Sequence, residues 1–230
     1  MGIPERKQRE KLLRQTQILD AAYQVFRDVG FLAATMDQIA DRAELAKGTI
    51  YIYFKSKEEL YFSLLAKGLD ILIELLSEKV KANPPPDAVL REIADAFYTY
   101  YRDYTDYFRI FMIMQQEDMH AKLSPELFKE INARVLAILR LVRGEIQKLL
   151  DHERALQVDS RLLTDILWGA FIGITQVALV REKLNVRRRN VEDLLLLCYE
   201  LIRKGIRTDG GRPKGKTARS EEKKPHSDRR

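Results

Sequence analysis

The stretch Thr35–Lys57, TMDQIADRAELAKGTIYIYFKSK, constrains the fold of this chain more than any other feature. Thr35 followed three residues later by Gln38 fits a capping box, and apolar residues at helical spacing then predict a short helix. Residues 44–46 are too few for anything but a turn, and a second short helix is expected over 47–54. Two short helices joined in this way form a helix-turn-helix, which lays its second helix in the major groove of DNA.

The second of these helices presents an unusual face. Ile50 and Phe54 point the same way, and we expect them to dock on neighbouring helices. Instead of the usual solvated Glu, Lys and Gln, the remaining positions carry an ammonium, a glycine, hydroxyls, aromatic rings and an isoleucine: Lys47, Gly48, Thr49, Tyr51, Ile52 and Tyr53. An ammonium and hydroxyls suit phosphates or guanine edges, isoleucine suits a thymine methyl, and glycine permits close backbone approach. For each single residue, the alternative is packing on a neighbouring helix or simple solvation.

The segment 15–65, and ILDAAYQVFRDVGFLAATMDQIADRAELAKGTIYIYFKSKEEL in particular, resembles the DNA-binding domain of TetR-family transcriptional regulators. The resemblance rests on the ILDAA opening, on T-x-x-x-I-A, and on K-G-T-I-Y-x-Y-F followed by K-S-K-E-E-L. It implies a homodimeric repressor that a small molecule releases from a palindromic operator. It also implies DNA contacts from Thr35, Lys47, Gly48, Thr49, Tyr51, Tyr53 and Lys57. Ala46 stands where the family often has a capping serine, and Ile52 replaces a frequently polar residue, so its base preference does not transfer.

The whole sequence predicts an all-α protein in four parts. A basic arm over 1–14 precedes the DNA-binding domain over 15–65, whose helix-turn-helix covers about 36–55. A helical ligand-binding and dimerisation domain follows over 66–207, and residues 208–230, which lack large apolar side chains, are expected to be disordered. The expected helices of the second domain lie at about 87–104, 106–118, 124–151, 160–182 and 191–207.

A long helix is expected to link the two domains. It begins after Ser56, which forms a second capping signature with Glu59, and Pro84-Pro85-Pro86 ends it. Because this helix starts beside the predicted DNA and reaches into the second domain, it can transmit a ligand signal as a tilt between domains.

Charge and composition narrow the class of protein. Of the net charge of +6, residues 1–57 contribute +3 (ten Lys and Arg against seven Asp and Glu) and residues 209–230 contribute +4 (eight against four). Basic ends around a near-neutral body fit a protein that meets a polyanion at one end. One cysteine, Cys198, suits a reducing cytoplasm. Residues 1–17 are polar, so we expect no signal peptide, and the most apolar run, Ile166–Val180, is expected to fall short of spanning a membrane.

Rings and methionines crowd the middle of the chain. They are too many for one packed helix face, and they predict a pocket for an apolar or aromatic small molecule. The candidate ligand-binding residues are Phe97, Tyr101, Tyr104, Phe108, Phe111, Met112, Gln115, Trp168 and Phe171. The alternative is that these rings are ordinary core between helices.

The last two helices carry more large aliphatic residues than an internal core requires. Leu194–Leu197 alone covers more than one helical face. A protein that reads two half-sites one DNA turn apart must dimerise, and a four-helix interface from two helices of each subunit fits this surplus.

Two other classes of function stay open. One is a DNA-binding activator, or a regulator controlled by a partner protein. The other is a metal-dependent helical-bundle enzyme, for which Glu117 and His120 supply a single E-x-x-H where di-iron bundles need two, and His152 is isolated at a helix end. No phosphate-binding glycine loop, nucleophile elbow or cysteine cluster is present, so we expect no catalytic residue, metal or cofactor.

Overall fold

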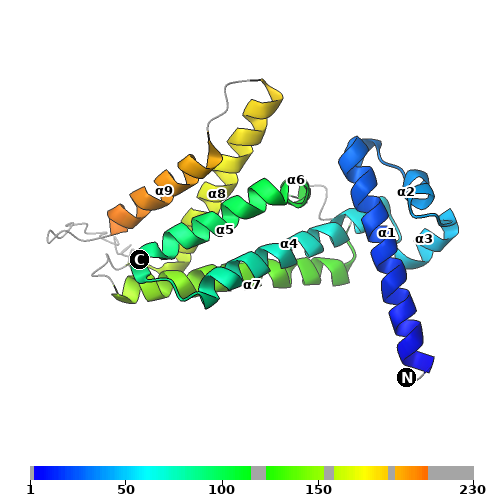
Figure 1. Ribbon diagram of the computed structural model, residues 1–230, viewed down its shortest axis with the longest axis horizontal. Coiled ribbons are helices and arrows are strands. Elements are labelled where there is room, and N and C mark those ends of the chain that lie inside the picture. Colours follow the sequence, from blue (N-terminus) through cyan, green and yellow to red (C-terminus); the bar gives the residue numbers. More distant parts are fainter. Residues whose placement is uncertain (1–2, 115–122, 153–157, 186–189, 207–230) are drawn as a thin grey trace, which may run out of the picture.

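A computed structural model describes residues 3–114, 123–152, 158–185 and 190–206. Within these ranges the chain forms α-helices, one short 3-10 helix over Pro86–Ala88 and no strand, which confirms the all-α class (Figure 1). The helices are α1 (Ile3–Ala33), α2 (Met36–Arg42), α3 (Lys47–Tyr53), α4 (Lys57–Lys81), α5 (Val89–Asp103), α6 (Thr105–Met114), α7 (Pro125–His152), α8 (Ser160–Lys183) and α9 (Val191–Ile206).

The helix-turn-helix forms as its capping signals predict. The Thr35 hydroxyl accepts a hydrogen bond from the Gln38 amide at 3.2 Å, and the Gln38 side chain accepts one from the Thr35 amide at 2.9 Å. Glu44, with φ 53°, turns the chain between α2 and α3. Ala46 provides no side-chain cap for α3, so this short helix depends on the packing of Ile50 and Phe54, which are 0% and 5% exposed.

The N-terminal basic segment is part of a helix. We predicted an arm over 1–14 before the first helix, but α1 already begins at Ile3 and continues through this segment. Gly30 adopts φ 77° and kinks the chain, which then continues as helix to Ala33. Positive φ is the conformation in which glycine has its advantage over other residues.

The linking helix α4 is 25 residues long and has both predicted ends. The Ser56 hydroxyl accepts a hydrogen bond from the Glu59 backbone amide at 3.1 Å. The Glu59 carboxylate accepts one from the Lys55 backbone amide at 2.6 Å. At the far end, Asn83 with φ 47° turns the chain into the three prolines. The helix therefore begins in the DNA-binding domain and ends at the opposite side of the second domain (Figure 1).

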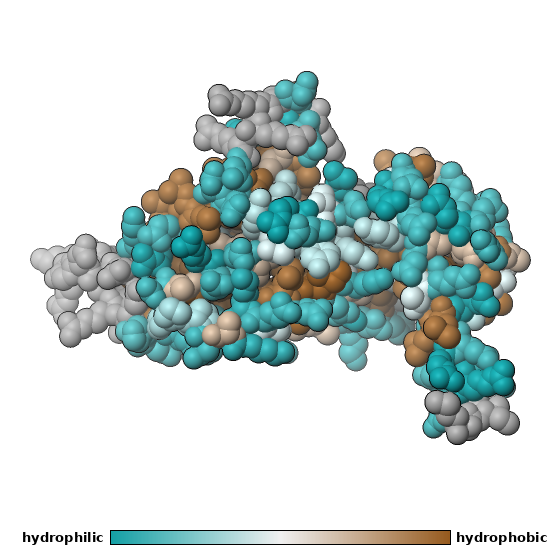
Figure 2. Space-filling model, in the orientation of Figure 1, coloured by the Kyte–Doolittle hydropathy of each residue, from teal (hydrophilic) through white to brown (hydrophobic). Residues whose placement is uncertain are grey.

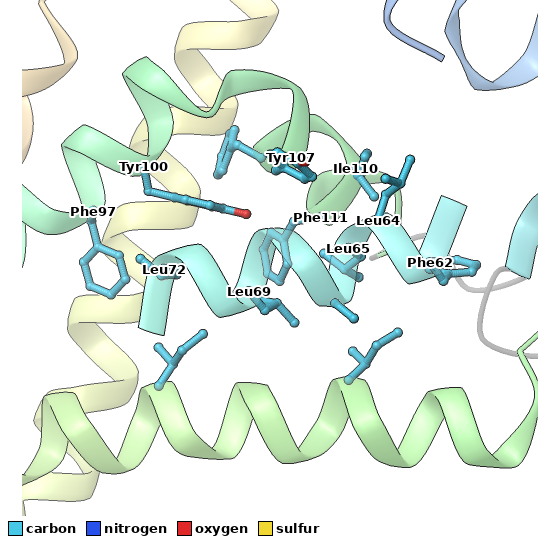
Figure 3. Close-up of a cluster of buried hydrophobic side chains, with 14 of the residues drawn as sticks. Phe62, Leu64, Leu65, Leu69, Leu72, Phe97, Tyr100, Tyr107, Ile110 and Phe111 are labelled. Atoms are coloured by element: carbon cyan, nitrogen blue, oxygen red, sulfur yellow. The ribbon is translucent and has the colours of Figure 1, made fainter. Parts of the chain in front are cut away.

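In the second domain, α4 lies along α7, and α5 and α6 pack on α4 (Figure 1). Helices α8 and α9 complete the bundle. Rings from α5 and α6 sit over the leucines of α4; Figure 3 shows Tyr100 and Phe111 above Leu69 and Leu72. The predicted helix ends agree with the observed ones within about two residues, except that α6 is described only to Met114. The predicted tail over 208–230 lies outside the described residues.

Helix α8 extends beyond the apolar run Ile166–Val180 that the sequence analysis considered. Its segment Ser160–Glu182 is 23 residues long and, by length and composition alone, could cross a membrane. Only one side of it is buried in the bundle, through Leu163, Leu167 and Phe171. The exposed apolar side of α8 therefore needs another explanation, given below.

Candidate nucleic-acid interface and ligand region

The outward face of α3 carries the residues predicted to contact DNA. Lys47 and Gly48 are exposed, Thr49 and Tyr53 are half-buried, and the side chains of Tyr51 and Ile52 are 45% and 79% exposed. An isoleucine that is mostly exposed, beside an exposed tyrosine, gains little from the fold of the monomer. This face is therefore available to a partner, as the helical periodicity predicted.

An acidic side chain holds the lysine of this face. The Lys47 ammonium donates a hydrogen bond to the Asp37 carboxylate at 2.8 Å, and this contact raises the pKa of Lys47. The lysine is therefore fully charged at neutral pH, and Asp37 fixes its position next to α2. Thr35, at the start of α2, is also exposed and uses its hydroxyl in the cap.

Lys57 has a role that differs from the predicted DNA contact. Its ammonium donates to the carbonyls of Phe31 at 2.8 Å and Ala34 at 2.9 Å, with a longer contact to Leu32 at 3.4 Å. It also lies 4.7 Å above the centre of the Phe31 ring. An ammonium has three donors. Because all three point at the end of α1, the structure assigns Lys57 to holding α4 on α1, and none is left for a phosphate.

The predicted ligand-binding residues come together, but they fill their own space. Phe97 stacks on Phe171 with ring centres 4.6 Å apart, and Trp168 meets Phe97 at 5.7 Å and Phe111 at 5.6 Å. Phe108 contacts Phe171 at 5.6 Å. Tyr104 and Met112 pack at the edge of this cluster, and Gln115 lies outside the described residues.

These rings make a close-packed core in this structure. The rings were expected to line an open cavity, but here they pack against one another.

A cavity lies beside the aromatic cluster, between α5, α8 and α9, and has a volume of about 450 Å³. Of the predicted ligand-binding residues that the structure describes, only Tyr101 lines it. The other wall residues are mostly aliphatic side chains near the end of α8 and the start of α9. Sequence patterns missed them because such residues are equally suited to an ordinary core.

The contact between the two domains contains residues that the sequence did not single out. The Tyr23 hydroxyl of α1 donates to the Asp106 carboxylate of α6 at 2.9 Å, and the Tyr23 ring stacks on Tyr107 with centres 5.2 Å apart. Burial, followed by the Asp106 contact, raises the pKa of Tyr23 to about 12. Nearby, Lys67 of α4 pairs with Asp20 of α1 at 3.3 Å. These contacts connect α6 to the DNA-binding domain.

Close packing also fixes α6 on α4. A methyl group built on Gly68 would lie 2.7 Å from Tyr107 Cβ and 2.9 Å from the Tyr100 hydroxyl. Tyr100 is 2% exposed, and its hydroxyl has no hydrogen-bond partner among the described residues. Burial raises the pKa of Tyr100, so this hydroxyl stays protonated.

Large apolar side chains are exposed along α8 and α9. They are Leu162, Ile166, Val177, Val180, Leu197 and Leu201, each about half exposed or more. Figure 2 shows apolar side chains exposed between hydrophilic ones on one face of the molecule. Large exposed apolar side chains on two packed helices make this side of the molecule a candidate site of association.

No metal centre is found in the part of the chain that the structure describes, where no three His, Cys, Asp or Glu side chains gather. Glu117 and His120, the only enzyme-like pair, lie outside the described residues. Cys198 is half-buried, and burial raises the pKa of its thiol, which makes it a poor ligand or nucleophile.

Comparisons with known proteins place the N-terminal domain in one group. Residues 18–64 match the family model described as bacterial regulatory proteins, tetR family. The transcriptional activator FasR of Mycolicibacterium smegmatis is 38% identical over 87 residues, which cover 38% of this chain and 40% of FasR. The fatty acid metabolism regulator protein of Bacillus subtilis is 37% identical over 73 residues, covering 32% of this chain and 38% of the relative. The chain thus matches less than half the length of either relative.

The likeness of fold extends over both domains. FadR from Bacillus subtilis, solved in complex with stearoyl-CoA, aligns with a TM-score of 0.67 at 23% identity, covering 83% of this chain and 98% of FadR. A TetR/AcrR-family regulator from Thermobifida fusca aligns with a TM-score of 0.67 at 25% identity, covering 85% and 99%. The relatives with named functions regulate transcription and are not enzymes, as the sequence led us to expect.

Proposed function

We propose that this chain, a member of the TetR family of bacterial regulatory proteins, is a dimeric one-component regulator that binds a palindromic operator and responds to an apolar small molecule. The observation that carries the DNA-binding part is the outward face of α3. Ile52 and Tyr51 are exposed, and Lys47 is exposed beside Asp37; all three lie on the second helix of a helix-turn-helix.

Each contact has a defined task in this proposal. Lys47, together with the hydroxyls of Thr49, Tyr51 and Tyr53, binds phosphates or base edges, and Ile52 meets a thymine methyl. Gly48 allows the backbone to approach the duplex, and Thr35 contacts a phosphate at the start of α2. We leave Lys57 out of this set because its ammonium is bound to the carbonyls that end α1.

Dimerisation through α8 and α9 accounts for the apolar side chains that these helices expose. A pair of helices from each subunit would form a four-helix interface and bury leucines such as Leu162, Leu197 and Leu201. The same contact accounts for the apolar character of α8, which does not indicate a membrane protein. We propose the cytoplasm as the location.

For the ligand we propose a molecule with a fatty acyl chain. One relative by sequence is named as a regulator of fatty acid metabolism, and FadR, similar in fold, was solved with stearoyl-CoA. Mostly aliphatic walls around a cavity of about 450 Å³ suit such a chain. The aromatic residues that the sequence predicted as ligand contacts would then pack beside the ligand site.

Repression is the first form of the regulation that we propose, with the ligand lowering operator affinity through α6. Tyr23, Asp106 and Tyr107 supply the contact between α6 and α1 by which a ligand can shift the DNA-binding domain. Activation is the second form, since the relative FasR is an activator. In both forms the two domains are coupled by the same contact.

Footprinting on the DNA that flanks the chain's own gene tests the proposal. We expect protection of two half-sites about one helical turn apart, and a change in protection when an acyl ligand is added. Substitution of Ile52 by Ala serves as the specificity control, because it should change base preference and leave the fold intact. Absence of salt-sensitive binding to any duplex would refute the proposal.

A further inference from the structure

The cavity between α5, α8 and α9 has mostly aliphatic walls. Its sides are formed by Ile174 and Val177 of α8 and by Val191 and Leu194 of α9. These branched aliphatic side chains offer no hydrogen bond to a polar ligand. Gly173 leaves further room, since a methyl group built there meets nothing within 4 Å. A volume of about 450 Å³ is within the range of small-molecule sites.

One end of the cavity is cationic. Arg181 lines it, is half-buried, and makes no hydrogen bond or ion pair with the described part of the chain. Its neighbour Glu182 also lines this end, but Glu182 is exposed and already takes part in another interaction. A half-buried guanidinium without a partner gains most from a charged acceptor, because charge-assisted hydrogen bonds are the strong ones.

From these two features we propose that the cavity binds an amphipathic anion, in which a single aliphatic chain lies on Ile174, Val177 and Leu194 and an anionic head meets Arg181. This assignment rests on the proposed function and makes it more specific, since it names the ligand site and the residue that selects a charged head. A fatty acid and an acyl-CoA share this chemistry, and the experiment below separates them.

The position of the cavity also connects it to the DNA-binding domain. Tyr101 lines the cavity, and its ring meets Phe108 of α6 with centres 5.4 Å apart. The next residue before Phe108 is Tyr107, which stacks on Tyr23 of α1 at 5.2 Å. A chain that displaces Tyr101 therefore acts on the helix that carries the contact between the domains.

The test is calorimetric titration of the full chain with dodecanoate, with 1-dodecanol and with dodecanoyl-CoA. For the unchanged protein we expect saturable binding of dodecanoate, about fourfold weaker for each methylene removed from the chain. Arg181→Gln should weaken dodecanoate about tenfold and leave 1-dodecanol unchanged, since only the acid has a charged head. Binding of the CoA ester alone would place the anionic head on its phosphates, and the same loss in Arg181→Gln is then expected for the ester.

Two glycines of α8 supply a matched pair of variants. Gly173→Leu should fill the cavity and abolish binding of every probe, whereas Gly169→Leu, four residues earlier and outside the cavity, should preserve it; a built methyl group meets nothing within 4 Å at either position. Sedimentation of both variants reports any effect on dimerisation. Equal losses for acid and alcohol in Arg181→Gln, or no binding of any probe, would overturn the assignment.

A separate readout distinguishes this inference from the proposed function. DNA affinity of the same protein samples is measured with and without dodecanoate. Bound dodecanoate with unchanged DNA affinity would keep the site and overturn its regulatory role. Loss of all DNA binding in the unchanged protein would instead overturn the proposed function, while the titrations still decide the site.

Discussion

The hydroxyl of Tyr23 on α1 donates a hydrogen bond to the carboxylate of Asp106 on α6 across 2.9 Å, and this contact joins the two domains. The ring of Tyr23 also stacks on Tyr107, so both ends of one side chain are held by α6. Movement of α6 therefore changes the environment of α1 directly.

Tyr23→Phe should weaken the coupling between ligand and DNA. The ring and its stacking remain, but the bond to Asp106 is lost. We expect the ligand-induced change in operator affinity to shrink by roughly threefold or more, as measured by fluorescence anisotropy. Tyr104→Phe is the control, since the Tyr104 hydroxyl has no hydrogen bond in the described ranges. An unchanged ligand response in Tyr23→Phe would contradict this role.

Gly68→Ala should destabilise the protein although alanine is the better helix former. The added methyl would lie 2.7 Å from Tyr107 Cβ, so α6 must shift away from α4. We expect a loss of about 1–3 kcal/mol in the free energy of unfolding, measured with urea. Gly144→Ala on α7, where a methyl meets nothing within 4 Å, should instead gain about 0.5–1 kcal/mol.

Substitution of two lysines of the DNA-binding domain should affect different properties: DNA affinity for Lys47 and stability for Lys57. Lys47→Ala should change the free energy of unfolding by no more than about 0.5 kcal/mol. It should lower operator affinity, and the slope of log affinity against log salt concentration should fall by about one. Tyr51→Ala should also weaken DNA binding with the fold intact. Lys57→Met should cost about 1–2 kcal/mol of stability, because two partly buried carbonyls lose their donor. A normal urea midpoint for Lys57→Met would refute its assigned role.

The exposed leucines of α9 should hold the dimer together. Leu197→Asp combined with Leu201→Asp places two charges on a surface that is 57% and 61% exposed in the monomer, so the monomer tolerates them and a dimer does not. We expect sedimentation velocity to show a monomer. Leu32→Asp, at a leucine 92% exposed on α1, is the matched control and should remain dimeric.

Stability should fall in alkaline solution. Burial raises the pKa of Tyr61, Tyr100 and Tyr199, and the pKa of Tyr23 rises from 10.0 to about 12. Because the folded protein favours the neutral phenols, their contribution is complete below pH 10 and declines as the pH rises toward 12 and above. The share of the tyrosinate absorbance that comes from these four phenols should therefore appear together with loss of helical circular dichroism. Titration of these four tyrosines near pH 10 in folded protein would be the contrary result.

Local signals in the sequence predicted most of the helices. Thr35 with Gln38 and Ser56 with Glu59 are capping pairs whose effect depends on a few neighbouring residues, so the observed starts of α2 and α4 follow from them. The outward face of α3 was likewise predictable from periodicity, because Ile50 and Phe54 fix which side is buried.

Contacts between distant segments were not predictable in this way. The role of Lys57 depends on the carbonyls of Phe31 and Ala34, which come close only after α1 folds against α4. The rings around Phe171 were expected to line a cavity, but whether rings enclose space or fill it depends on the angles between helices. The cavity near Arg181 arises from those angles as well, and no local pattern marks it.

The ammonium of Lys57 has a further consequence for how the protein can change. It fastens the end of α1 to the start of α4, so we expect α1, α2 and α3 to follow a change in the direction of that helix. In the proposed dimer, a shift in the direction of α4 would then alter the spacing between the two recognition helices without deforming either. The DNA-binding domain and the ligand-binding domain can accordingly change in sequence at different rates. This agrees with the comparisons, in which sequence identity of 37% to 38% covers about a third of this chain while the fold is shared over most of it.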